Sequence, residues 1–190
     1  MGTDERGQAR RKAAFIDRDG TVTQSVAYYI TKPSQVELEE GAAEAIRLLR
    51  SKGFLIVIIT NQAGVARGIL TEDDLAAIHT AMREKLAALN ADVDAIYYCP
   101  HHPEGLIERY SGECSCRKPK PGMMLRAAKD LGIDLKASVM IGDAERDVAS
   151  GKAAGCETFL VKRKPLTEPT VADHCVASLL EAARMICKRA

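Results

Sequence analysis

Phe15-Ile16-Asp17-Arg18-Asp19-Gly20-Thr21-Val22 places two carboxylates at the end of a short apolar run and follows them at once with Gly-Thr. The run at 13–16 predicts a short strand, and Gly20 permits a sharp turn after it. Side chains two residues apart in an extended chain point to the same side, so Asp17 and Asp19 are expected to converge on one target. Two such carboxylates repel each other unless a cation or a shared proton relieves them. An Asp-x-Asp pair is common, so its role depends on the rest of the chain.

The chain alternates short apolar runs with longer amphipathic segments. Strands are predicted at 13–16, 55–59, 95–98, 139–141 and 158–161, with a weaker candidate at 174–176. Helices are predicted at 41–51, 71–89, 123–131, 147–154 and 178–188. This alternation is typical of a mostly parallel sheet with helices on both faces. The predicted fold class is therefore α/β, a three-layer sandwich.

Composition narrows the classes of protein that fit. The chain has 190 residues, which suggests one domain, expected at 13–190 after a polar, disordered lead-in at 1–12 that lacks the apolar core of a signal peptide. The absence of Trp and the net charge of +1 argue against a nucleic-acid platform or a membrane-surface protein. No apolar run is long enough to span a bilayer. We expect a cytoplasmic protein whose six cysteines are thiols or metal ligands rather than disulfides.

Polar groups gather where the predicted strands end, the edge at which open parallel sheets bind ligands. Asp17 and Asp19 follow the first strand, Thr60-Asn61-Gln62 the second, and Asp143 the fourth, while Lys118 closes the long connection after the third. Each has an ordinary explanation when taken alone, such as a turn cap, a solvated lysine or a helix-start acid. Their occurrence together at one edge predicts a shared site.

This set of groups suits phosphoryl transfer, which depends mainly on positioning and charge neutralisation. Asp17 is expected to attack phosphorus and form an aspartyl-phosphate. Asp19 is expected to protonate the leaving alkoxide and then to take a proton from water. Oxygen ligands for Mg2+ are expected from Asp17, Asp143 and the backbone carbonyl of Asp19. The phosphoryl oxygens are expected to be bound by Thr60, Asn61, Gln62 and Lys118.

The ordered pattern Asp17-x-Asp19-Gly-Thr, Thr60, Lys118 and Gly142-Asp143 resembles the four motifs of the haloacid dehalogenase superfamily of phosphatases. The resemblance runs from about Ala13 to the C-terminus. It implies a Rossmann-like sheet, dependence on Mg2+ and the roles described above. Asp147 would then support the metal ligands without binding the ion itself. The alternative is an Asp that starts a helix and has no part in catalysis.

A cluster of cysteines and histidines lies in the long connection at 100–121. Cys99, His101, Cys114 and Cys116 supply the three thiols and one imidazole of a closed tetrahedral zinc site, with His102 as the rival nitrogen ligand. The spacing within each pair is tighter than is usual for zinc, and ordinary reduced thiols are the simpler alternative. A structural zinc ion would hold this loop in place and position Arg117 and Lys118.

Cys-Pro-His-x-Pro, Cys-x-Cys-Arg-Lys-Pro and the stretch at 60–68 together look like the family of D-glycero-D-manno-heptose-1,7-bisphosphate 7-phosphatases. The resemblance implies removal of the 7-phosphate during synthesis of nucleotide-activated heptose for lipopolysaccharide, by an enzyme that is capless or nearly so and monomeric. Arg67 and Arg117 are then candidates for holding the distal end of the substrate. Ala144 stands where this family often carries Lys, which leaves the preferred anomer open.

Three alternatives remain. Histidinol-phosphate phosphatase domains share the zinc loop, although the twelve residues between His101 and Cys114 favour the heptose type. A receiver-type signalling domain also combines acids, Thr and Lys around Mg2+, but its phosphoacceptor follows a middle strand. A zinc-stabilised binding module would leave Asp17, Asp19 and Lys118 unexplained.

Overall fold

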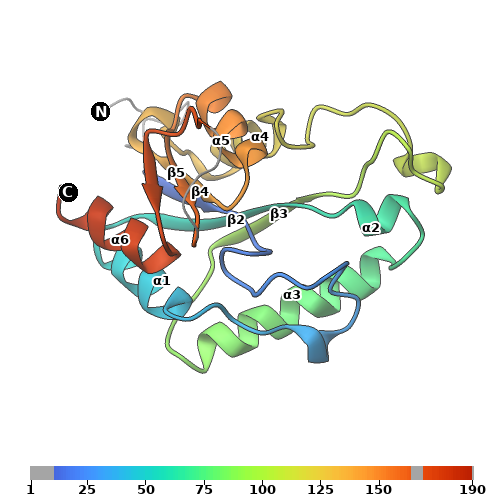
Figure 1. Cartoon of the computed structure of the whole chain (residues 1–190), viewed down its shortest axis with the longest axis horizontal. Coiled ribbons are helices and arrows are strands. Elements are labelled where there is room, and N and C mark those ends of the chain that lie inside the picture. Colours follow the sequence, from blue (N-terminus) through green and yellow to red (C-terminus); the bar gives the residue numbers. More distant parts are fainter. Residues whose placement is uncertain (1–10, 164–168, 190) are drawn as a thin grey trace.

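The computed structural model describes residues 11–163 and 169–189 (Figure 1). Residues 1–10, most of the predicted disordered lead-in, lie outside this part of the chain. Arg11 is already tied to the fold, because its N–H donates to the Gly132 carbonyl at 2.9 Å and its carbonyl accepts from the N–H of Asp134 at 2.8 Å. In the described part of the chain, contacts with the rest of the fold therefore begin at Arg11, two residues before the predicted start of the domain at 13.

The described residues build one six-stranded sheet. Its strands are β1 (Ala13–Ile16), β2 (Leu55–Asn61), β3 (Ala95–Cys99), β4 (Val139–Gly142), β5 (Glu157–Val161) and β6 (His174–Val176). Their order is β3-β2-β1-β4-β5-β6, and every neighbouring pair is parallel. The chain runs outward from β1 to β3 and then returns to β4 on the other side of β1. The carboxyl ends of β1 and β4 thus form the topological switch point at which such sheets bind ligands.

Helices cover both faces of the sheet, as predicted (Figure 1). They are α1 (Ala42–Ser51), α2 (Ala63–Ala66), α3 (Glu72–Ala87), α4 (Gly122–Leu131), α5 (Glu145–Ala154) and α6 (Leu179–Cys187). Alternate residues of β1 enter two different cores. Ala14 and Ile16 pack with α1, α3 and α6, whereas Ala13 and Phe15 pack with α4. Among the described helices, none has both the length and the apolar character that crossing a membrane requires.

The two long connections contain only short 3-10 turns, at Pro33–Gln35 and Glu108–Tyr110. The first connection, after β1, is tied back by an antiparallel bridge between Thr23 and Leu38. The second, after β3, is attached to α2 because the N–H groups of Leu106 and Ile107 both donate to the Ala66 carbonyl, at 2.7 and 2.9 Å. Both connections therefore lie over the carboxyl edge of the sheet in fixed positions.

Candidate active site

A buried lysine joins two carboxylates at the switch point. Nζ of Lys118, from the loop before α4, lies 2.9 Å from Oδ1 of Asp17 and 2.6 Å from Oδ1 of Asp147, and it donates to the Ile59 carbonyl at 2.8 Å. Asp17 directly follows β1, and Asp147 lies in the first turn of α5. The buried ammonium is thus held by ion pairs to two carboxylates and by a hydrogen bond to one carbonyl.

The charges of this cluster are coupled. Burial raises the pKa of Asp17 to about 6, against the lowering effect of Lys118, while the charges of Asp147 and Asp19 raise it further. Burial alone would lower the pKa of Lys118, but the two facing carboxylates outweigh it and raise that pKa. Asp17 is therefore an ionised carboxylate at neutral pH, next to a permanent ammonium.

A third acid completes a site that suits a divalent cation. Carboxylate oxygens of Asp17, Asp143 and Asp147 lie within 4.8 Å of one another. Burial and then the charge of Asp17 raise the pKa of Asp143, and its Oδ1 is buried without a hydrogen-bond partner among the described residues. A hard cation would relieve both the repulsion and the unpaired oxygen, and oxygen donors suit Mg2+. Asp147 is already engaged, since Oδ2 accepts from the N–H of Ala144 at 3.0 Å and Oδ1 faces Lys118.

Gly20 is required by this arrangement for two reasons. Its φ of +83° lies in the left-handed region that side chains disfavour. In addition, a Cβ at this position would lie 2.4 Å from Oδ2 of Asp143. The glycine after the Asp-x-Asp pair therefore leaves the space that the third carboxylate occupies.

Asp19 has other partners than Asp17. The Arg18 guanidinium forks onto its carboxylate, from Nε to Oδ1 at 2.9 Å and from one terminal nitrogen to Oδ2 at 2.8 Å. Gln62 also donates to Oδ2, at 2.9 Å. Asp17 and Asp19 share no hydrogen-bond donor side chain among the described residues.

The polar triplet that ends β2 divides its roles. Thr60 is buried and accepts from the Gln62 amide at 2.8 Å. Asn61 forms a reciprocal pair with the backbone of Lys118, donating to its carbonyl and accepting from its N–H, each at 3.0 Å. The Asn61 side chain thus ties the lysine loop to the sheet.

The two candidate distal arginines lie around His102. Arg67 donates to the hydroxyl of Tyr29 at 3.0 Å and lies 3.3 Å from Nε2 of His102, whereas Arg117 donates to the carbonyl of His101 at 3.1 Å. Burial has the largest effect in lowering the pKa of His102, and the charges of Arg117 and Arg67 lower it further. These contacts join the connection after β1, the end of α2 and the cysteine loop at one place.

The cysteine loop brings four candidate ligands together. Donor atoms of Cys99, His101, Cys114 and Cys116 lie within 4.8 Å of one another, with 3.0 Å between the sulfurs of Cys99 and Cys116. The hydrogen bond between these two thiols lowers the pKa of Cys116 to about 5 and raises the pKa of Cys99. Three sulfurs and one imidazole fit a tetrahedral zinc ion. Of the two rival histidines, the structure brings His101 into this cluster and places His102 against Arg67.

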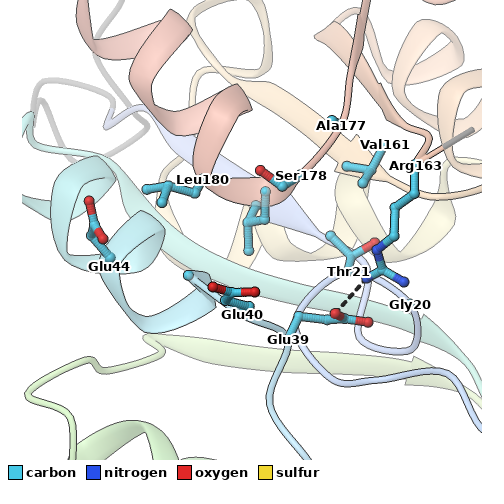
Figure 2. Close-up of a pocket in the computed structure, with 12 residues that line it drawn as sticks. Gly20, Thr21, Glu39, Glu40, Glu44, Val161, Arg163, Ala177, Ser178 and Leu180 are labelled. Atoms are coloured by element: carbon cyan, nitrogen blue, oxygen red, sulfur yellow. Dashed lines mark ion pairs between the residues drawn. The ribbon is translucent and has the colours of Figure 1, made fainter.

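A hollow of about 450 Å³ is lined in part by Gly20 and Thr21, in the turn after Asp19 (Figure 2). Figure 2 shows Arg163 reaching Glu39 across it, and the remaining charged residues of its wall are Glu40 and Glu44. Three carboxylates line both this hollow and the Asp17 cluster, so charge alone does not distinguish them. Among the described residues, the carboxylates of the Asp17 cluster are close enough together to hold a divalent cation, which would offset their charge toward a phosphorylated substrate.

Sequence reasoning missed Arg18 and His79. Arg18 is 1% exposed and lies 3.1 Å from Nε2 of His79, a residue of α3 that is itself buried. Helical periodicity could have indicated that His79 is buried, because it falls on the apolar face of α3 with Leu75 and Met82.

The comparisons with known proteins agree with this geometry. A family profile described as HAD-hydrolase-like matches residues 115–182. The D-glycero-beta-D-manno-heptose-1,7-bisphosphate 7-phosphatase of Pasteurella multocida (strain Pm70) is 42% identical over 93% of this chain and 97% of its own length. The enzyme of that name from Escherichia coli (strain K12) is 40% identical over 93% of this chain and 94% of its own. The crystal structure of D,D-heptose 1,7-bisphosphate phosphatase from B. bronchiseptica, complexed with magnesium and phosphate, superposes with a TM-score of 0.81 at 32% identity, covering 94% of this chain and 99% of that one.

The parallel sheet, with its acids and lysine at the switch point, defines a phosphatase of the haloacid dehalogenase type. The resemblance predicted from the four motifs is thereby confirmed. Within that class, the chain belongs to the family of D-glycero-beta-D-manno-heptose-1,7-bisphosphate 7-phosphatases.

Proposed function

We propose that this enzyme removes the 7-phosphate of D-glycero-D-manno-heptose 1,7-bisphosphate through an aspartyl-phosphate on Asp17. The observation that carries the proposal is the buried Lys118–Asp17 contact at the switch point of the sheet, beside the unpaired oxygen of Asp143. The names of the relatives support the choice of substrate.

In the first step, an oxygen of Asp17 attacks phosphorus while the bond from phosphorus to the sugar oxygen breaks. Asp19 gives its proton to that departing oxygen. Lys118 holds Asp17 in place and offsets negative charge that gathers at the phosphoryl group. In the second step, water attacks phosphorus, Asp19 takes the proton of that water, and the bond to Asp17 breaks to release phosphate.

Asp17, Asp143 and the backbone carbonyl of Asp19 would hold Mg2+, with Asp147 supporting the site through Lys118. When bound, this ion neutralises charge on the phosphoryl oxygens. Gln62 donates to both Asp19 and Thr60, and these residues with the Asn61 region would contact a bound phosphoryl group. The Asn61 side chain also fixes the backbone of Lys118.

The cysteine cluster would hold a structural zinc ion, which fixes the loop that carries Arg117 and Lys118. Arg67 and Arg117, placed beside His102, would hold the distal end of the substrate. We place the reaction in nucleotide-activated heptose synthesis for lipopolysaccharide and in the cytoplasm, in keeping with six cysteines that form no disulfide, and expect a monomer.

The experiment compares kcat/KM for phosphate release from both heptose 1,7-bisphosphate anomers and from histidinol phosphate, with Mg2+ present. We expect a preference of about a hundredfold for a heptose bisphosphate, or about 2.7 kcal/mol of transition-state discrimination. Comparable rates on histidinol phosphate would keep the chemistry and overturn the substrate.

The Asp17→Asn variant tests the chemistry itself. It should release no phosphate from any of these substrates, since the amide cannot act as the nucleophile. Near-normal turnover by this variant would rule out the mechanism. If the wild-type protein instead formed a phosphoprotein that lasts for minutes and turned over no phosphomonoester, that result would support a receiver-type domain.

A further inference from the structure

Arg18, the residue between the two aspartates, lies almost completely inside the protein. Only 1% of it is exposed, and it is among the largest fully buried side chains. Burying a guanidinium is costly unless its charge is paired and its N–H groups are bonded. Asp19 supplies the paired charge through two parallel hydrogen bonds, and such a fork fixes the plane of a carboxylate as well as its distance.

The remaining terminal nitrogen of Arg18 contacts the α3 helix. It lies 3.1 Å from Nε2 of His79, which is 8% exposed. A contact of this kind is attractive only if Nε2 accepts, so the imidazole is neutral and carries its proton on Nδ1. Burial and the neighbouring guanidinium lower the pKa of His79 to about 3, which keeps the ring in that form at neutral pH.

His79 is itself held firmly. Its ring lies against the ring of Tyr98 in β3, with the centroids 5.9 Å apart. The hydroxyl of Tyr98 donates to Glu72 at 2.7 Å, in the first turn of the same helix. The imidazole is thus fixed between α3 and β3, two elements that belong to the rigid frame of the fold.

These contacts form a chain from the frame to the reacting groups: Tyr98, His79, Arg18 and Asp19. We propose that His79, acting through Arg18, is a positioning residue that orients the carboxylate of Asp19 for proton transfer. This inference rests on the proposed function, because it assigns Asp19 the role of general acid and base. Without an acceptor at position 79, the guanidinium loses one of its two anchors and the carboxylate loses a fixed plane.

The test uses two substrates that differ in their need for a proton. The sugar oxygen of heptose bisphosphate is a poor leaving group, whereas 4-nitrophenyl phosphate releases a stable phenolate that departs without general acid. kcat/KM reports on the steps up to departure of the leaving group, so the later hydrolysis of the phosphoenzyme does not enter.

For the His79→Leu variant with Mg2+ we expect kcat/KM to fall at least about tenfold on the heptose bisphosphate and less than about threefold on 4-nitrophenyl phosphate. His79→Gln keeps an acceptor and should restore most of the loss. Thr80→Val, on the next residue of α3 and exposed, is the matched control and should leave both substrates unchanged. Equal losses on the two substrates would show a merely structural role and overturn the proposal, as would no loss on either.

If His79→Leu fails to fold, Arg18→Lys provides the second test. Lysine keeps the positive charge but not the fork, so the same selective loss on the heptose bisphosphate is expected, and equal losses would again count against the proposal. The proposed function and the positioning role of His79 can be disproved independently. An active Asp17→Asn variant would remove the proposed function, whereas an inactive one combined with equal losses in His79→Leu would remove only the positioning role.

Discussion

Nζ of Lys118 lies 2.9 Å from Oδ1 of Asp17, and neither side chain is more than 5% exposed. Lys118→Met keeps the length of the side chain but leaves Asp17 and Asp147 buried without a counter-charge. We expect the free energy of unfolding to fall by about 3–5 kcal/mol and kcat to fall by about a hundredfold or more. Denaturant unfolding and initial rates of phosphate release measure the two effects.

Lys129→Met is the control for that variant. Lys129 is exposed on α4, so its loss should change stability by less than about 1 kcal/mol and leave kcat unchanged. A Lys118→Met variant as active as this control would show that the buried ammonium has no part in the reaction.

Gly20→Ala tests the packing behind the metal site. The new Cβ would lie 2.4 Å from Oδ2 of Asp143, so the carboxylate must move. We expect the Mg2+ concentration for half-maximal activity to rise about 10- to 100-fold, the range seen when the surroundings of a metal ligand are disturbed. A titration of activity with Mg2+ measures this shift.

Gly155→Ala separates backbone strain from the clash. Gly155 also has a positive φ, +85°, but among the described residues no heavy atom beyond its immediate surroundings in the chain lies within 4 Å of a Cβ placed there. This variant should lose stability of about 1 kcal/mol while its Mg2+ dependence stays that of the wild type. Equal shifts in both variants would mean that strain, and not contact with Asp143, is responsible.

The parallel sheet and the position of its catalytic edge were predictable from the sequence. Strand positions follow from short apolar runs, and side chains that follow those runs must meet at one edge of a parallel sheet. The predicted strand at 13–16 matches β1, and that at 174–176 matches β6. Helix α2 was not predicted, because four residues are too few for helical periodicity to register.

Contacts between distant parts of the chain were not predictable in the same way. The pairing of the Asn61 side chain with the Lys118 backbone, 57 residues away, was not predicted. The contact between Arg18 and His79 spans 61 residues. Spacing patterns record only the geometry of a single element, so they place a side chain at an edge or on a face without fixing its partner.

The buried imidazole of His79 predicts a pH dependence of stability. Burial, and then the charge of Arg18, lower its pKa to about 3 in the folded protein, against about 6.5 in an unfolded chain. Between these pH values the unfolded state binds a proton that the folded state does not. The contribution of the neutral, buried His79 to the free energy of unfolding is therefore complete above about pH 6.5 and is lost as the pH falls toward 3. Near pH 5 the free energy of unfolding should change with pH by about 1.4 kcal/mol per pH unit from this residue.

His79→Gln has no group that titrates at this position. Its free energy of unfolding should therefore fall less steeply between pH 6.5 and 4.5 than that of the wild type, by about 1 kcal/mol per pH unit. Urea unfolding at a series of pH values gives both slopes. In the difference between them, the effect of titrating carboxylates cancels, because both proteins have the same carboxylates. Parallel curves would show that His79 is not buried as a neutral ring.

The cysteine cluster predicts both a metal content and a stability that depends on it. Elemental analysis of active protein should find about one zinc per chain. In Cys116→Ser the zinc content should fall below half, and the thermal midpoint should fall, because the loop at 100–121 loses the ion that closes it. Cys156→Ser is the matched control, since Cys156 is buried outside the cluster and should keep the full metal content. Activity of Cys116→Ser should also fall, because Lys118 lies two residues beyond the lost ligand. Active wild-type protein with far less than one zinc per chain would contradict the assignment, and the four side chains would then be an ordinary group of thiols and one imidazole.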